Sequence, residues 1–165
     1  MPISVFFRRA SAQDLSPIVA LYLEDTRGRT RESLDALLWD RYTKAFKAID
    51  QDPRQLLVVG MVEDLLVATC QLTLIPSLTH QGGLRLQIEG VHVKNEYQGR
   101  TIGRQMLAWA FEYGQEKGAV MAQLTTHKSR KDAQRFYHQL GFEASHIGMK
   151  RFLKESIPLD MKEFT

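Results

Sequence analysis

The sequence contains one cysteine, Cys70, among 165 residues. A single cysteine excludes an intramolecular disulfide framework. Its neighbours Thr69 and Gln71 belong to a strand-like run, and no histidine or carboxylate lies close to it in the sequence. We therefore interpret Cys70 as a core residue, with a nucleophilic role as the weaker alternative.

Long apolar runs are also missing. Runs such as Leu65 to Cys70 are far shorter than the roughly 18–20 residues that span a bilayer. At the N-terminus Arg8 and Arg9 follow the apolar stretch, whereas a secretory signal carries its charge first. We therefore expect no membrane span and a cytoplasmic protein.

The excess of charge is small. The formal net charge is +3, with 44% hydrophobic and 25% charged residues, which suits one globular domain over residues 1–165. A mild positive excess fits a pocket for one phosphorylated cofactor as well as a polyanion, and no nucleic-acid motif is present, so no nucleic-acid partner is expected. The histidines have no metal-ligand spacing, so no metal is predicted.

The hydrophobic periodicity predicts an α/β (α+β) fold in the order β-α-α-β-β-β-α-β-α-β. A capping-box pattern, Ser11 to Asp14, precedes the first helix. The helical crossover between the last two central strands predicts that this pair is parallel within a mixed, mostly antiparallel sheet with helices on both faces. The predicted strands are Ile3–Arg9, Gln55–Val62, Leu65–Ile75, Leu84–Val93, Ala119–Thr126 and a last region from Phe142 to Leu153.

The strongest functional signal follows the strand Leu84–Val93. The turn Gln98–Gly103 leads into a helix, and such a turn exposes unpaired N–H groups at the positive end of the helix dipole, where anions bind. Its spacing fits neither a P-loop nor a dinucleotide fingerprint. Taken alone, Gly99 and Gly103 could equally serve to turn the chain and to pack the helix on the sheet.

Three motifs together resemble the GNAT superfamily of N-acetyltransferases. Gln98–Gly103 is similar to its Gln/Arg-x-x-Gly-x-Gly/Ala signature, Ile88–Val93 to its central strand, and Tyr137–Phe142 to its Tyr-x-x-Leu-Gly-Phe helix end. Two positions depart from the family pattern. Thr101 replaces the first glycine of the signature, where its side chain could hinder the diphosphate, donate to it or cap the helix. Arg130 stands where many family members have asparagine. Its side chain could be exposed to solvent or could bind an anionic group of the cofactor or substrate.

The resemblance implies a single GNAT-like domain that moves an acetyl group from acetyl-CoA to a primary amine by direct attack in a ternary complex. Glu89 is the implied base, directly or through water, and Tyr137 the implied acid toward the thiolate. Alternatively, Glu89 is a carboxylate paired with a neighbouring arginine or a backbone amide, and Tyr137 is a core tyrosine with a satisfied hydroxyl. The residues implied to bind acetyl-CoA are Val91, His92 and Val93 through their backbone, and Gln98, Gly99, Arg100, Thr101, Ile102, Gly103 and Arg104.

By strand alternation the His92 side chain should point to the face opposite Glu89. The resemblance also implies that Tyr22 to Leu38 helps to bind a small-molecule amine acceptor, and it leaves a homodimer open. A catalytically weak or inactive acyl-CoA-binding regulatory module, suggested by Thr101, is the alternative function.

Overall fold

The computed structural model describes residues 3–25 and 31–153, apart from the side chain of Leu37. Five strands form one sheet in the order β1-β2-β3-β4-β5. All neighbours are antiparallel except β4 and β5, which are parallel, so the predicted mixed sheet is confirmed. The strands are β1 Phe6–Arg9, β2 Gln55–Val62, β3 Leu65–Ile75, β4 Leu84–Val93 and β5 Ala119–Gln123.

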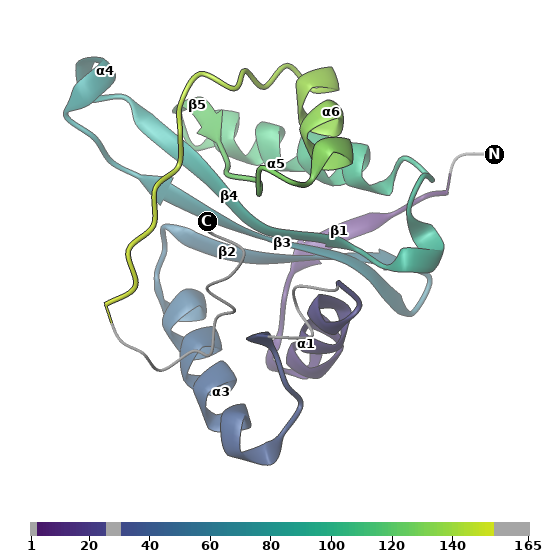
Figure 1. Cartoon of the computed structure of the whole chain (residues 1–165). Helices are drawn as coiled ribbons and strands as arrows, with labels where there is room; N and C mark the ends of the chain where they lie inside the picture. Colours follow the sequence, from purple (N-terminus) through teal and green to yellow (C-terminus); the bar gives the residue numbers. More distant parts are fainter. Residues whose placement is uncertain (1–2, 26–30, 154–165) are drawn as a thin grey trace.

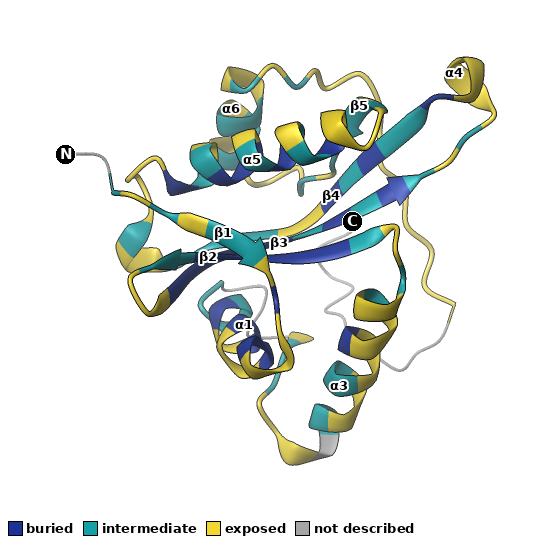
Figure 2. Ribbon diagram, turned by 180° about the vertical axis from the view of Figure 1, so that it is seen from behind, coloured by how far each residue is buried: buried dark blue, intermediate teal, exposed yellow. Residues whose placement is uncertain are grey.

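Helices cover both faces of this sheet, as predicted (Figure 1). α1 (Leu15–Leu23) and α3 (Ala36–Gln51) lie on one face, and α5 (Ile102–Glu116) and α6 (Lys131–Gln139) on the other. Strand side chains alternate between the faces. Val58, Cys70 and Ile88 therefore pack under α5, whereas Leu57 and Val59 pack under α1 and α3. Figure 2 shows buried residues along the strands and on the sides of the helices that face the sheet.

A buried carboxylate joins β1 to the first helix. Asp14 accepts hydrogen bonds from the Ser11 N–H at 2.7 Å and from the Arg8 guanidinium at 2.7 and 2.9 Å. The Arg8 bond is the largest cause of a pKa for Asp14 of about 2. The capping pattern predicted from the sequence thus fixes the entry into α1, with the short 3-10 helix η1 (Ala12–Asp14) between them.

The last predicted strand is wrong. No strand lies within the described residues after β5, and the chain from Phe142 to Leu153 runs extended past the sheet (Figure 1). Ile147, Met149 and Leu153 in it are 89–92% exposed. An apolar pattern alone cannot form a strand, because each strand needs a neighbour for its backbone N–H and C=O groups.

Smaller differences concern short elements. Two short helices were not predicted from the sequence: α4 (Thr79–Gly82), which contains the left-handed residues His80 and Gln81, and the 3-10 helix η2 (Asn95–Tyr97). β1 and β5 are shorter than expected. Within the described ranges, no helix combines the length and the apolar character that crossing a membrane requires.

Candidate active site

The parallel strands β4 and β5 separate half-way along β4. Their pairing runs from Leu84 opposite Ala119 to Gln87 opposite Gln123, where β5 ends. β4 continues to Val93, and among the described residues its only strand neighbour there is β3. The side of β4 that faced β5 is therefore an open edge from Ile88 onward, and an extended molecule can pair with it as an added strand.

A bulge in β4 marks the start of this open edge. Gln71 pairs with Glu89 and Thr69 with His92, so two residues of β4 stand opposite the single residue Cys70. Gly90 is one of the two and has a φ of +60°, a conformation that glycine adopts without steric cost. The extra residue shifts the alternation of every side chain beyond it.

The bulge corrects the expected orientation of His92. Cross-strand partners share a face, and Thr69 and Gln71 stand two residues apart on β3, so Glu89 and His92 lie on the same face of the sheet. Val91 and Val93 accordingly pack with the core under α5, whereas the His92 ring contacts Tyr22 of α1. The prediction that His92 points away from Glu89 is therefore wrong, because it assumed a regular strand.

The turn into α5 holds a row of free backbone donors. The N–H groups from Gly99 to Arg104 have no acceptor among the described residues, and the first bond of the helix is donated by Gln105 to the Thr101 carbonyl. Gly99 has a φ of +72°, and a side chain there would meet no atom within 4 Å. Successive N–H groups at a helix N-terminus form a site suited to phosphate oxygens.

Thr101 adopts a left-handed backbone at the start of α5. Its φ is +65°, which is unusual for a β-branched residue and costs about 1–2 kcal/mol. Its hydroxyl does not cap the helix but accepts a hydrogen bond from Gln105 Nε2 at 3.2 Å. The turn thus keeps the shape that a glycine would give, and the donors of the first helical turn stay free.

Two residues of this turn have structural contacts. Gln98 Nε2 donates to the Val93 carbonyl and to Asn95 Oδ1, both at 3.1 Å, which ties the turn to the end of β4. A side chain at Gly103 would stand 3.2 Å from the Phe136 ring of α6. Gly103 therefore serves close packing between α5 and α6 as well as the signature.

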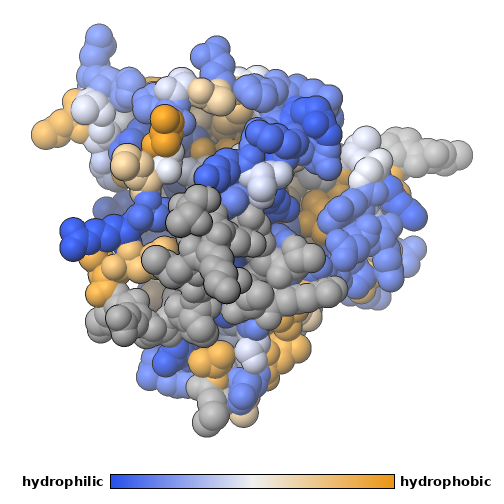
Figure 3. All heavy atoms as spheres, viewed as in Figure 1, coloured by the Kyte–Doolittle hydropathy of each residue, from blue (hydrophilic) through white to orange (hydrophobic). Residues whose placement is uncertain are grey.

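The positive charges of the turn are exposed. The Arg100 guanidinium lies 5.5 Å from the centre of the Tyr97 ring, and Arg104 is exposed on the first turn of α5. Figure 3 shows a largely hydrophilic surface over the α6 side of the molecule. Both arginines are free to move toward an anion bound at the turn.

The two predicted catalytic side chains differ in their surroundings. Glu89 is exposed on the α1 face of β4, so its carboxylate is not desolvated by burial. Tyr137 on α6 is half-buried against Phe136 and Phe142. Burial is the main cause of its raised pKa, and Arg130 acts in the opposite direction. Its hydroxyl has no hydrogen bond to a described residue, unlike that of a satisfied core tyrosine.

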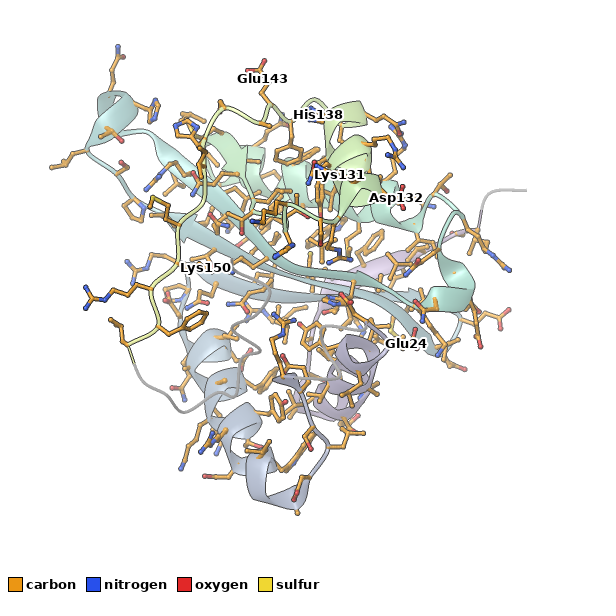
Figure 4. All side chains as sticks on the ribbon, viewed as in Figure 1. Glu24, Lys131, Asp132, His138, Glu143 and Lys150 are labelled. Carbon is orange, nitrogen blue, oxygen red and sulfur yellow. The ribbon has the colours of Figure 1, made fainter. Side chains whose placement is uncertain are left out.

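A cluster of charged side chains that was not predicted from the sequence lies beside the bulge. Asp25 Oδ2 stands 3.7 Å from His92 Nε2 and 3.4 Å from Arg130 Nη1. It joins the end of α1 to the start of α6 across the sheet, and Figure 4 shows Glu24 below the sheet and Lys131 above it at these two ends. The bulge glycine in mid-strand was the signal that could have revealed this cluster.

Cys70 is buried in the core opposite the bulge, as expected. Burial raises the pKa of its thiol to about 12, so the thiol stays protonated at neutral pH and is no nucleophile. Among the described residues no group of three His, Cys, Asp or Glu side chains is placed to hold a metal ion.

Comparison with known proteins identifies the family of this chain. The acetyltransferase (GNAT) family matches residues 16–142, which include the bulge, the turn Gln98–Gly103 and α6. The chain belongs to the GNAT family. By that family it is an N-acetyltransferase, with the five-stranded mixed sheet of GNAT structures.

Individual relatives carry different names. The chain is 29% identical over 147 residues to the aminoalkylphosphonate N-acetyltransferase of Salmonella typhimurium, covering 89% of this chain and 88% of that protein. It is 41% identical to a transcriptional regulator from Bacillus halodurans, with a TM-score of 0.87 over 91% of this chain and all of that one. A predicted acetyltransferase from Clostridium acetobutylicum, solved with acetyl-CoA, shares the fold at 17% identity, with a TM-score of 0.68 and coverage of 97% and 98%.

Proposed function

We propose that this GNAT chain transfers an acetyl group from acetyl-CoA to the primary amine of a small molecule. The observation that carries the proposal is the continuity of two features: the row of free N–H groups from Gly99 to Arg104 and the open edge of β4 beyond Gln87. Diphosphate oxygens suit the first and an extended pantetheine arm suits the second. The thioester would then lie at the bulge.

The residues of the turn take different parts in this proposal. Gly99, Arg100, Thr101, Ile102, Gly103 and Arg104 offer backbone donors or charge to the diphosphate, and Val91, His92 and Val93 offer the backbone edge. Gln98 acts as a positioning residue, because both of its side-chain hydrogens are used within the protein. A backbone N–H of the edge would polarise the thioester carbonyl.

Proton transfer completes the reaction. The acceptor arrives as an ammonium ion and must lose a proton before its nitrogen attacks the carbonyl carbon. Glu89, on the face of β4 that α1 borders, can accept that proton through water. When the C–S bond breaks, the Tyr137 hydroxyl protonates the departing thiolate and regains a proton from the new amide nitrogen.

The first acceptors to test are aminoalkylphosphonates, after the name of the Salmonella relative. Purified protein with acetyl-CoA and a panel of primary amines is expected to release the CoA thiol and to form N-acetyl product, read by a thiol reagent and by mass spectrometry. Glu89→Gln should lower kcat by about 10²-fold while acetyl-CoA affinity stays within about twofold. Tyr137→Phe should also lower kcat. Full activity in both variants would show that these roles are wrong.

A regulatory module is the second candidate, favoured by the name of the Bacillus halodurans protein and by Thr101 at the signature glycine. It predicts acetyl-CoA binding without turnover on any amine. Robust turnover on one amine in the same panel excludes an inactive module.

A further inference from the structure

We propose that His92, Asp25 and Arg130 form the acceptor site for an amine that also carries an anionic group, with His92 Nε2 as the atom that takes the proton from the ammonium ion. The inference rests on the proposed acetyl transfer and names its substrate class. It starts from an orphaned polar atom: His92 Nε2 is buried and has no hydrogen-bond partner among the described residues.

The other ring nitrogen fixes the tautomer of His92. Its Nδ1 lies 3.2 Å from the Gly90 carbonyl oxygen, and a carbonyl can only accept, so Nδ1 carries the proton and Nε2 the lone pair. Burial is the main cause of a lowered pKa for His92, and Arg130 and Arg31 lower it further, while the Gly90 bond and Asp25 oppose them. The ring is therefore neutral at pH 7.

Geometry pairs this lone pair with a carboxylate. His92 Nε2 and Asp25 Oδ2 are 3.7 Å apart, too far for a direct hydrogen bond. An ammonium nitrogen placed about 2.9 Å from each atom can donate one hydrogen bond to His92 Nε2 and a second to Asp25 Oδ2. The side chains of His92 and Asp25 are 16% and 17% exposed, so the site is enclosed without being sealed.

Arg130 supplies the complementary charge. Its guanidinium now lies 3.4 Å from the same Asp25 oxygen, and its side chain is 45% exposed. Such an ion pair contributes at most about 1 kcal/mol, so an incoming ammonium can displace it. The released guanidinium then faces the acceptor and can bind a phosphonate or carboxylate two or three bonds from the amine. A plain alkylamine offers it nothing.

The proton steps balance with the rest of the site. R–NH₃⁺ gives one proton to His92 Nε2, and the free amine attacks the thioester carbon. The C–S bond breaks, the thiolate takes a proton from Tyr137, and the amide nitrogen returns one to Tyr137. His92 then passes its proton through water to Glu89, on the same face, which releases it to solvent.

Kinetics test the role of His92. His92→Asn keeps a donor for the Gly90 carbonyl but removes the base, so kcat should fall about 10²-fold while acetyl-CoA affinity is kept. Wild-type kcat/KM should fall as pH drops through a pKa below 6.5, and His92→Asn should lose this acid limb. The His92 ring contacts Tyr22, and the charged groups that act on it are Asp25, Arg31 and Arg130. The control is His138→Asn, exposed at the outer end of α6 (Figure 4).

A second variant tests the anion pocket. Arg130→Gln should raise KM for 2-aminoethylphosphonate about tenfold or more and leave that for n-propylamine unchanged. Arg135→Gln, on the same helix and paired with Asp132, should change neither. Equal KM changes for both amines, or an unchanged acid limb in His92→Asn, would overturn the proposal.

A readout without turnover keeps this inference separate from the proposed function. ¹⁵N NMR of the imidazoles should show His92 protonated on Nδ1 at pH 7, with a shift at Nε2 when 2-aminoethylphosphonate is added. An Nε2–H tautomer, or no shift at saturating amine, overturns the site. Failure of every amine to react would instead count against the proposed function, and the NMR result would still decide the site.

Discussion

Thr101 combines a strained backbone with a place in the turn that we propose binds the diphosphate. It is a β-branched residue with a left-handed φ of +65° at the N-terminus of α5, which strains the backbone. The αL conformation exposes the N–H groups of the turn, so the geometry of the family signature is kept with a residue that is poorly suited to it. Its hydroxyl is engaged by Gln105, not by the helix N–H groups.

Substitution at Thr101 separates strain from hydrogen bonding. Thr101→Gly should change the free energy of unfolding by less than about 1 kcal/mol, because relief of about 1–2 kcal/mol of strain is offset by the flexibility of glycine. Thr101→Ala keeps the strain and loses the Gln105 bond, so it should destabilise by about 1 kcal/mol. Urea unfolding of both variants measures the difference. A larger loss for Gly than for Ala would contradict this account.

His92 shows why single residues were placed less well than elements. Its membership of β4 was predicted correctly. The face of the sheet to which its side chain points depended on one extra residue at the bulge. Strand alternation cannot reveal such an insertion without the partner strand. Asp25 and Arg130 are 105 positions apart in the sequence, and only the tertiary fold brings the Arg130 guanidinium to the Asp25 carboxylate.

Among the elements, β4 connects the sheet to the candidate site. It pairs with β5 over its first half, bulges at Gly90 and ends in the turn to α5. Its first half holds the sheet together, and its second half offers a free edge. The bulge makes this division, since it redirects the strand and places Glu89 and His92 on one face.

Gly90→Ala tests the bulge. A Cβ there would lie 3.2 Å from the Tyr22 hydroxyl in a left-handed backbone, so the variant should lose about 1–2 kcal/mol of stability and most of its acetyl transfer. Gly118→Ala is the matched control, because it has a φ of +82° and no atom within 4 Å of a Cβ. It should lose similar stability but keep transfer, measured at a temperature where both variants are folded. Equal activity in the two variants would show that the bulge does not shape the site.

The elements themselves were largely predictable. β2, β3 and β4 have the bounds expected from the sequence, because each is an apolar run closed by a turn, a proline or a polar stretch. The last region failed because Ile147 and Met149 alternate with polar residues as in a strand, yet they are exposed and unpaired. Pairing is a property of two segments, and one segment's pattern cannot establish it.

The whole molecule is a sheet covered by helices on both faces, and the two faces carry different parts of the candidate site. α5 and α6 lie on one face with the turn into α5 and Tyr137, and α1 and α3 lie on the other with Tyr22 and the His92 cluster (Figure 1). The open edge of β4 lies between these two sides. A cofactor bound along it would present its thioester to an acceptor held near α1.

Acetyl-CoA bound along this edge and at the turn into α5 should stabilise the folded protein. Thermal unfolding of the intact chain should shift upward with acetyl-CoA, because the ligand binds only the folded state. At 100 times Kd the gain is about 2.7 kcal/mol, or about 5–10 °C for a chain of this size. Pantetheine, which lacks the diphosphate that the turn from Gly99 to Arg104 would hold, should give no comparable shift. An unchanged melting temperature at millimolar acetyl-CoA, or an equal shift with pantetheine, would contradict the account.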